Sequence, residues 1–284
     1  MGAGIAQVFA TSGHHVDLID LSQAALDRGQ AAIQSSLARV LKKERITQDE
    51  LDAALANLSY HTDLASGVQA ADLVIEAATE NVDLKLKIFG ELSNLAPAAS
   101  PLATNTSSIS ITKIAAATNR PDKVIGMHFM NPVPVMKLVE VIRGYATSDA
   151  TTDLVMRLSR ELGKTPVEVN DYPGFVANRV LMPMLNEAMY TLWEGVAGVT
   201  EVDTVMKLGM AHPMGPLQLA DYIGLDTCLA ILNVMHEGFG RAHHRACPLL
   251  VNMVTAGKLG RKSGEGFYDY SGGGKDLVVS KNFS

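Results

Sequence analysis

The sequence is short of cysteine, of aromatic residues and of long hydrophobic runs. Only Cys228 and Cys247 are cysteines among 284 residues, and aromatic residues make up 5%. Two cysteines are too few for a disulfide scaffold, and no apolar run approaches the roughly 20 residues that a membrane helix needs. The N-terminus has neither the basic start of a signal peptide nor the Arg/Ser bias of a transit peptide. We therefore expect a soluble protein of the reducing cytoplasm, with no membrane partner.

An excess of positive charge is also missing. Lys and Arg number 24 against 30 Asp and Glu, which gives a net charge of −6. The basic residues are scattered, apart from short clusters at residues 42–45 and 261–262. Proteins that bind nucleic acid usually present a basic patch or stripe, so we expect no nucleic-acid partner. The 47% of hydrophobic residues can bury a sizeable core, and the length corresponds to about two domains of roughly 150 residues.

The pattern of the chain changes near Asn170. Before it, short apolar runs alternate with helical patterns, which predicts a mostly parallel sheet covered by helices on both faces. After it, helical periodicity continues almost throughout, and Val176, Val180, Met184 and Ala188 form one stripe. We expect an α/β domain over residues 1–169 and an all-helical domain over residues 170–284. Residues 271–275, rich in glycine, are expected to be a flexible start to the tail.

The first helix and strand resemble half of a dinucleotide-binding unit. A helix begins at Gly2, and a strand over residues 15–20 ends in Asp20, an acid placed to bind the adenine ribose hydroxyls. Only the last glycine of the Gly-x-Gly-x-x-Gly fingerprint can be Gly2, so the Rossmann-like sheet lacks its first strand here. By itself, such a segment is more often an ordinary structural unit than a cofactor site. No arginine follows Asp20, which favours NAD over NADP.

The missing strand would be central in a doubly wound sheet and would pair on both sides. We therefore expect the strands at residues 15–20 and 72–77 to stand apart beside Gly2 rather than to pair directly. The same reasoning predicts that this chain binds NAD weakly and is poorly soluble, and that about ten residues ahead of Met1 would restore both properties.

Polar residues at strand ends are candidates for chemistry. Ser107 lies in a loop after the strand at residues 102–105, although Ser107 and Ser108 could equally cap the next helix. His128 ends the strand at residues 124–129, and Glu140 lies on the following strand, from which it could hydrogen-bond the imidazole. Such a pair could act as a general base, or it could be a satisfied structural histidine.

The helical part offers weaker candidates. Asn178 opens its first helix and could donate to a substrate carbonyl or form a structural hydrogen bond. Met182, Met184 and Met189 are expected to fill the core. His243 and His244 lie near Cys247, but nothing else suggests a metal ligand set, so we predict no metal site.

Eight segments in order resemble the 3-hydroxyacyl-CoA dehydrogenase family, and specifically its short, single-function members of the 3-hydroxybutyryl-CoA dehydrogenase type. They are Gly4-Ile-Ala-Gln-Val8, Ile75-Glu-Ala-Ala-Thr-Glu-Asn81, Asn105-Thr-Ser-Ser108, Gly126-Met-His-Phe-Met-Asn-Pro132, Met136-Lys-Leu-Val-Glu-Val141, Pro173-Gly-Phe-Val-Ala-Asn-Arg179, His212-Pro-Met-Gly-Pro216 and Gly264-Glu-Gly-Phe-Tyr268. Each segment alone is weak, but together they span nearly the whole chain.

The resemblance implies an enzyme that oxidises an L-3-hydroxyacyl-CoA to the 3-ketoacyl-CoA with NAD and forms a homodimer through the helical domain. It implies the following roles: His128 as base, Glu140 as its partner, Ser107 and Asn178 at the reacting oxygens, Gly2, Asp20, Glu80, Lys85 and Asn105 at the cofactor, and Ser36 and Lys43 on a long helix at the CoA moiety.

Two other readings stay open at this point. L-gulonate dehydrogenases resemble the same family and oxidise a sugar acid with the same His–Glu logic, but they have no need of the basic helix face formed by Ser36, Arg39 and Lys43. The chain could also be an inactive, truncated dimeric scaffold, and the discriminating observation is whether the purified chain enhances NADH fluorescence at all.

Overall fold

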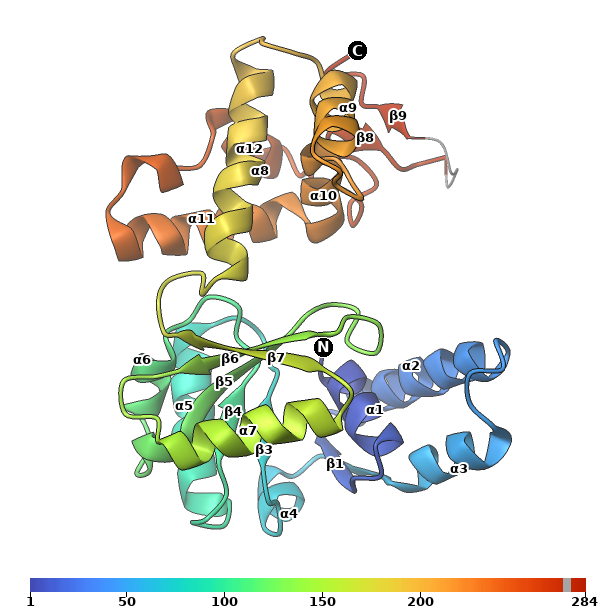
Figure 1. Ribbon diagram of the computed structural model, residues 1–284, viewed down its shortest axis with the longest axis vertical. Coiled ribbons are helices and arrows are strands. Elements are labelled where there is room, and N and C mark those ends of the chain that lie inside the picture. Colours follow the sequence, from blue (N-terminus) through green and yellow to red (C-terminus); the bar gives the residue numbers. More distant parts are fainter. Residues whose placement is uncertain (273–276) are drawn as a thin grey trace. The chain divides into compact units, whose positions relative to one another are not determined.

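The structure, a computed structural model, describes residues 1–272 and 277–284, so most of the glycine-rich segment at 271–275 lies outside the described residues. The chain forms two compact units, Met1–Tyr172 and Pro173–Ser284. The change of unit therefore falls three residues after the boundary expected from the sequence. Each unit is described by itself (Figure 1).

The first unit is an α/β domain. Its helices are α1 (Gly2–Thr11), α2 (Gln23–Leu41), α3 (Gln48–Ala56), α4 (Leu64–Val68), α5 (Val82–Leu95), α6 (Ile111–Ala115), the short η1 (Pro121–Lys123) and α7 (Asp149–Glu161). Its strands are β1 (Val16–Ile19), β2 (Leu58–His61), β3 (Val74–Glu76), β4 (Leu102–Thr104), β5 (Val124–Phe129), β6 (Leu138–Arg143) and β7 (Thr165–Asn170).

The strands of this unit form two separate sheets. In the larger one the order is β3-β4-β5-β6-β7, with β5 and β6 antiparallel and the other neighbours parallel. The smaller one pairs β1 with β2 in parallel. Within the described residues β1 does not pair with β3, which confirms the expectation that these two strands stand apart.

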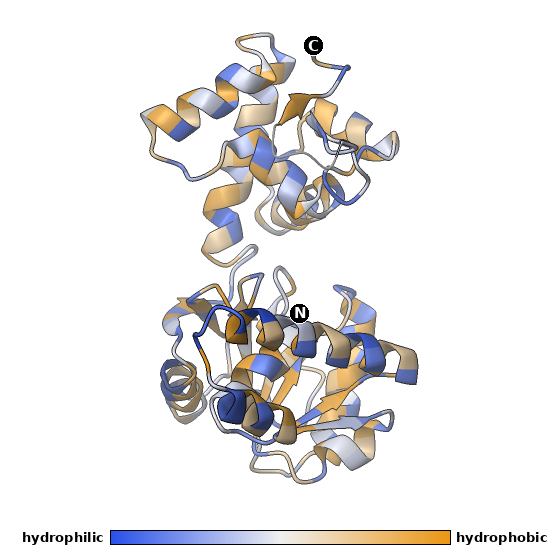
Figure 2. Cartoon of the chain, turned by 90° about the vertical axis from the view of Figure 1, so that its right-hand side faces the viewer, coloured by the Kyte–Doolittle hydropathy of each residue, from blue (hydrophilic) through white to orange (hydrophobic). Residues whose placement is uncertain are grey.

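Helix α1 packs on both sheets with its two sides. Ile5 and Phe9 lie in a core with residues of β4, β5, β6 and α7, whereas Ala6 and Ala10 pack with α2, α3 and Leu58. The strands of the larger sheet are largely apolar, as the orange ribbon in Figure 2 shows, and β5 is buried along its whole length. Strands β4, β5 and β6 are buried along most of their length, which explains why they form continuous hydrophobic runs in the sequence, whereas β7 is mostly exposed.

Two details differ from the sequence prediction. Helix α2 ends at Leu41, so Lys43 lies beyond the helix. It therefore does not share a helix face with Ser36. Glu44 adopts a left-handed backbone (φ 54), and a new helix starts at once with a capping box between Thr47 and Glu50. The sequence favours a helix that continues through the basic residues 42–45, because this stretch has neither glycine nor proline. The prediction also missed α3 and β2.

The second unit is mainly helical. It contains α8 (Ala177–Trp193), α9 (Val199–Gly209), α10 (Pro216–Ile223), α11 (Leu225–Phe239), η2 (Ala242–His244), α12 (Pro248–Thr255) and a two-stranded antiparallel sheet of β8 (Tyr268–Asp269) and β9 (Val278–Val279). Met182 and Met189 are buried in its core and Met184 packs against it, as predicted. The expected stripe is only partly buried, because Val176 and Val180 are exposed.

Two buried aspartates hold the end of the chain onto the helices. The Asp203 carboxylate accepts hydrogen bonds from the backbone of Leu217 and from the Tyr268 hydroxyl. Asp221 accepts from the backbone of Phe267 and Tyr268 and from the Tyr270 hydroxyl. Burial raises the pKa of Asp221 to about 6, although these donors act in the opposite direction.

In the Gly264–Tyr268 segment, Gly266 has a steric reason to be glycine. A Cβ on Gly266 would lie 1.9 Å from Asp221 Oδ1, so only glycine allows the loop to approach this carboxylate.

Among the described residues, no single helix is both long and apolar enough to cross a membrane. By length and composition alone, the bent pair α10 and α11, with 96° between them, passes the same test.

Candidate active site

His128 and Glu140 face each other across two antiparallel strands. They are direct partners in the register of β5 and β6, and His128 Nδ1 lies 2.9 Å from Glu140 Oε2. Both side chains are buried, at 7% and 3% exposure. The contact expected from the two strand positions is therefore present. An ionised carboxylate can only accept, so Nδ1 carries the hydrogen and Nε2 is the accepting nitrogen.

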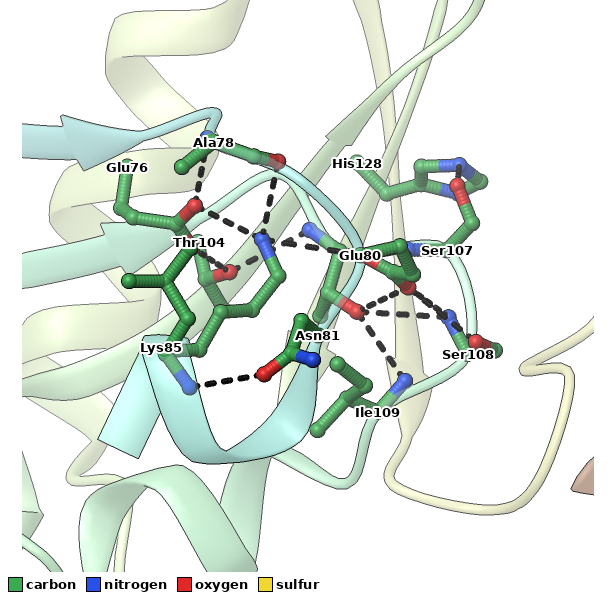
Figure 3. Close-up of polar contacts among 12 residues, drawn as sticks. Glu76, Ala78, Glu80, Asn81, Lys85, Thr104, Ser107, Ser108, Ile109 and His128 are labelled. Atoms are coloured by element: carbon green, nitrogen blue, oxygen red, sulfur yellow. Dashed lines mark hydrogen bonds and ion pairs between the residues drawn. The ribbon is translucent and has the colours of Figure 1, made fainter. Parts of the chain in front are cut away.

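Ser107 lies on the other side of the same imidazole. Its Oγ is 3.0 Å from His128 Nε2, so the Ser107 hydroxyl can donate to the nitrogen that would take up a proton. Neither Ser107 nor Ser108 caps the following helix, because Ser110 does so. The result is a continuous chain of side chains from Ser107 through His128 to Glu140 (Figure 3 shows the Ser107 end).

The loop that carries Ser107 is fixed at several points. Asn105 Oδ1 accepts from the backbone N–H of Phe129, which ties the start of the loop to β5 next to His128. Glu80 accepts from the backbone of Ser107 and Ser108, at 2.9 and 3.0 Å. Asn105 and Glu80, both expected at the cofactor from the resemblance, therefore also hold the serine loop.

Lys85 is almost completely buried, with 1% of its side chain exposed. Its Nζ is 2.6 Å from Glu76 Oε1 and 3.6 Å from Glu80 Oε2. The Thr104 hydroxyl donates to the other oxygen of Glu76. Figure 3 shows this group beside the serine loop. Sequence reasoning did not single out Glu76 or Thr104, because nothing in a strand-like run marks a residue as the partner of a buried lysine.

The loop between His128 and Glu140 is fixed by Lys164. Lys164 Nζ donates to the carbonyl oxygens of Val133 and Met136, at 2.6 and 2.9 Å. Burial lowers the pKa of Lys164. This residue too was missed, because a lysine before a strand carries no signal of a contact 28 residues away.

The N-terminal part of the first unit fits the adenosine end of a dinucleotide. Gly2 begins α1, where the first-turn N–H groups favour an anion, and a Cβ on Gly2 would have no neighbour nearer than 3.9 Å. Asp20 follows β1 directly and is exposed, so its carboxylate is open to ribose hydroxyls. In chemical character, these two residues suit NAD.

The remaining candidates lie elsewhere. Ser36 is half-buried on α2, and Lys43 is exposed in the turn after that helix. Arg39 donates to Ser35 on the same helix. Asn178 is buried in the first turn of α8, in the second unit. In the described part of the chain, no group of three or more His, Cys, Asp and Glu side chains could hold a metal ion.

A histidine supported by a carboxylate at the ligand edge of a dinucleotide-binding domain is an arrangement typical of dehydrogenases. Residues 1–172 match the model of the 3-hydroxyacyl-CoA dehydrogenase NAD binding domain, and residues 174–270 match that of the 3-hydroxyacyl-CoA dehydrogenase C-terminal domain. The chain therefore belongs to the 3-hydroxyacyl-CoA dehydrogenase family and is an NAD-dependent dehydrogenase, as the resemblance predicted.

Individual relatives agree with this assignment. A probable 3-hydroxybutyryl-CoA dehydrogenase of Bacillus subtilis is 54% identical over 270 residues, which cover 95% of this chain and 94% of the relative. A 3-hydroxybutyryl-CoA dehydrogenase of Bradyrhizobium diazoefficiens is 51% identical over 272 residues, covering 96% and 92%. The crystal structure of (S)-3-hydroxybutyryl-CoA dehydrogenase from Ralstonia eutropha has a TM-score of 0.92 at 51% identity and covers 95% of each chain.

Proposed function

We propose that this protein oxidises a short-chain L-3-hydroxyacyl-CoA, such as 3-hydroxybutyryl-CoA, to the 3-ketoacyl-CoA, with His128 as general base. The observation that carries the proposal is the chain of contacts Ser107–His128–Glu140, with 3.0 Å on one side of the imidazole and 2.9 Å on the other. The relatives named above support the substrate class.

The chemistry divides between the cofactor and the protein. NAD, when bound, supplies the hydride acceptor for C3 of the substrate. His128 Nε2 takes the proton of the substrate hydroxyl, and the carboxylate of Glu140 stabilises the imidazolium that forms. Ser107 orients the reacting oxygen toward Nε2, and the resemblance assigns Asn178 a contact to the substrate oxygen.

The binding roles follow the same division of the chain. The sheet domain, Met1–Tyr172, would hold NAD, with Gly2 at the phosphates and Asp20 at the adenosine ribose. The helical domain, Pro173–Ser284, would contribute substrate and dimer contacts. Ser36 and Lys43 would bind the CoA moiety, since Lys43 is exposed and its ammonium can reach a phosphate.

The test is a substrate panel with NADH formation as the readout. Purified protein at saturating NAD is given L-3-hydroxybutyryl-CoA, its D-enantiomer or L-gulonate. We expect turnover of the L-acyl-CoA alone. Turnover of L-gulonate in place of the acyl-CoA would contradict the proposal. An absence of both NADH fluorescence enhancement and turnover would favour the inactive scaffold.

We also propose a homodimer formed through the helical domain. Apolar side chains at the end of α9 are exposed, with Val205 at 61%, Leu208 at 82% and Met210 at 61%. An exposed apolar patch of this kind is typical of a protein interface. Light scattering should give the mass of two chains, and Leu208→Glu should give that of one; a monomeric parent protein would contradict this proposal.

A further inference from the structure

A single helical turn, residues 132–136, lies between strands β5 and β6. Within it, two backbone N–H groups donate to the carbonyl oxygen of Pro132 at 3.0 Å. A turn this short leaves the carbonyl groups at its end without regular helical partners. Lys164 Nζ satisfies two of them, because it donates to the carbonyl oxygens of Val133 and Met136 at 2.6 and 2.9 Å. Lys164 therefore caps the turn with a cation, the charge that the carbonyl end of a helical turn favours.

The backbone on both sides of Lys164 fixes its position. Helix α7 is followed by Gly163 in a left-handed conformation (φ 69), and the Lys164 N–H then donates to the carbonyl oxygen of Ser159 at 3.0 Å. On the other side, the Thr165 N–H donates to the carbonyl oxygen of Lys137 at 2.8 Å, where the pairing of β7 with β6 begins. Lys164 thus reaches the turn from a backbone that is held by a helix end and by a sheet.

The turn also contacts the first helix. Val133 is 2% exposed and belongs to a core that includes residues of α1. The approach is closest at Gly4, where a Cβ would lie 3.1 Å from Val133 Cβ and 3.6 Å from the Pro134 ring. Gly4 is in the first turn of α1, two residues after Gly2. The turn therefore packs against the end of the helix whose N–H groups favour an anion.

Much of the turn faces solvent. Val135 is 72% exposed and Met136 is 41% exposed. A segment with little buried apolar surface depends on a few specific contacts and opens at a low free energy. Loss of the Lys164 contacts should therefore release the carbonyl end of the turn, while Val133 still holds it to α1.

We propose that Lys164 is a positioning residue for the cofactor, which holds the turn at residues 132–136 against the first turn of α1. The inference rests on the proposed function, because that function places the NAD phosphates at Gly2. A released turn would shift against this end of the helix, and a displacement of about 1 Å can cost a hundredfold when it misplaces a bound group. Lys164 would act through the two carbonyls, without a contact to cofactor or substrate. The competing role is a general contribution to stability, which changes the amount of folded enzyme but not its affinity for NAD.

The test compares Lys164→Met with Lys123→Met as the matched control. Lys123 Nζ also donates to two backbone carbonyls, those of Ala98 and Ala99 at 2.9 and 3.1 Å, but Lys123 precedes β5 at the opposite end from His128. We expect Lys164→Met to raise both the NADH dissociation constant and KM for NAD by about 10- to 100-fold. Lys123→Met should leave both within about twofold of the parent. Lys164→Arg keeps a cation with several donors and should return both to within about threefold.

Three results would overturn the inference. One is an NADH dissociation constant in folded Lys164→Met that equals that of the parent. The second is an equal rise in Lys164→Met and Lys123→Met, which would indicate a general loosening of the domain. The third is the same rise in Lys164→Arg as in Lys164→Met, which would mean that the cation does not anchor the turn.

A second variant tests the same contact from the helix, in case Lys164→Met does not fold. Alanine favours a helix over glycine by about 1 kcal/mol, so Gly4→Ala should fold. Its new Cβ requires Val133 to move by a few tenths of an ångström, while Lys164 stays in place. We expect the NADH dissociation constant to rise by about three- to tenfold. An unchanged affinity in Gly4→Ala would refute the positioning role.

The binding readout separates this inference from the proposed function. NADH affinity is measured without substrate, so the result does not depend on which hydroxy compound the enzyme oxidises. If L-3-hydroxybutyryl-CoA is not turned over, the proposed function fails, but the difference in NADH affinity between the two lysine variants is still expected.

Discussion

Replacement of Glu140 by glutamine removes one charge from the site and little else. The side chain keeps its size and one acceptor oxygen, so the contact to His128 Nδ1 can persist. What is lost is the attraction between a carboxylate and the imidazolium that forms when His128 takes up a proton. Because both side chains are buried, solvent weakens this attraction less than at the surface.

The size of the effect follows from the geometry. The two charge centres are about 4 Å apart, and two unit charges at that distance attract by about 4 kcal/mol at an effective dielectric constant of roughly 20. The amide dipole of glutamine restores part of this attraction, so the transition state loses about 2 to 4 kcal/mol of stabilisation. We therefore expect kcat to fall by about 30- to 1,000-fold, since each 1.36 kcal/mol is about tenfold in rate.

The assay is steady-state NADH formation at saturating substrates, with NADH affinity and thermal melting measured in parallel. Glu168→Gln is the control, because Glu168 lies on β7 beside β6 and forms an exposed ion pair with Arg143. Exposed pairs contribute little, so the control should retain the parent rate. A folded Glu140→Gln variant with kcat within threefold of the parent would refute the reasoning.

Three further predictions concern other parts of the chain. Arg120→Met should lower the free energy of unfolding by about 3 to 5 kcal/mol in urea, because the buried guanidinium donates to four backbone carbonyls in the last turn of α5 and just after it. Lys123→Met, which removes two more exposed contacts, should cost less than about 1 kcal/mol, and equal costs would contradict this prediction. The pKa of Asp221 is raised from 3.8 to about 6. Protonation of this carboxyl therefore adds about 3 kcal/mol to the free energy of unfolding below about pH 4, and this stabilisation is lost as the pH rises through 6. Urea unfolding at several pH values should show this slope in the parent but not in Asp221→Asn, and an identical slope in both would be evidence against it. Lys43→Glu should raise KM for acetoacetyl-CoA by about tenfold but leave KM for the pantetheine thioester nearly unchanged, and equal effects on both would mean that Lys43 contacts no phosphate.

The sequence was most informative where strands carry the functional residues. Strand β5 matches its predicted range, and β6, Leu138–Arg143, differs by one residue from the strand that the pattern predicts over residues 137–142, so the two strand positions alone could bring Glu140 to His128. Gly126 shows how tight this pairing is, because a Cβ there would lie 2.8 Å from Ile142. Periodicity determines which face a strand buries, and register then determines which residues are opposite each other.

Contacts between residues far apart in the sequence could not be predicted from it. The Glu80 contacts to the serine loop join residues 26 to 28 positions apart, and the Asp221 contacts to the tail join residues 46 to 49 apart. No local propensity or period encodes such pairs, because they depend on how the loops fold back. The end of α2 before Lys43 was missed for a related reason, since the turn at Glu44 is closed by backbone hydrogen bonds to Val40 and Leu41 and contains no glycine.

The central claim is that His128 accepts the substrate proton in an NAD-dependent oxidation of an L-3-hydroxyacyl-CoA. The most direct test compares the protein with its His128→Gln variant at saturating NAD and L-3-hydroxybutyryl-CoA, with NADH formation followed in time. We predict that kcat falls by about 10²- to 10⁴-fold while NADH affinity stays unchanged. A folded variant that binds NADH and turns over at the parent rate would contradict the claim.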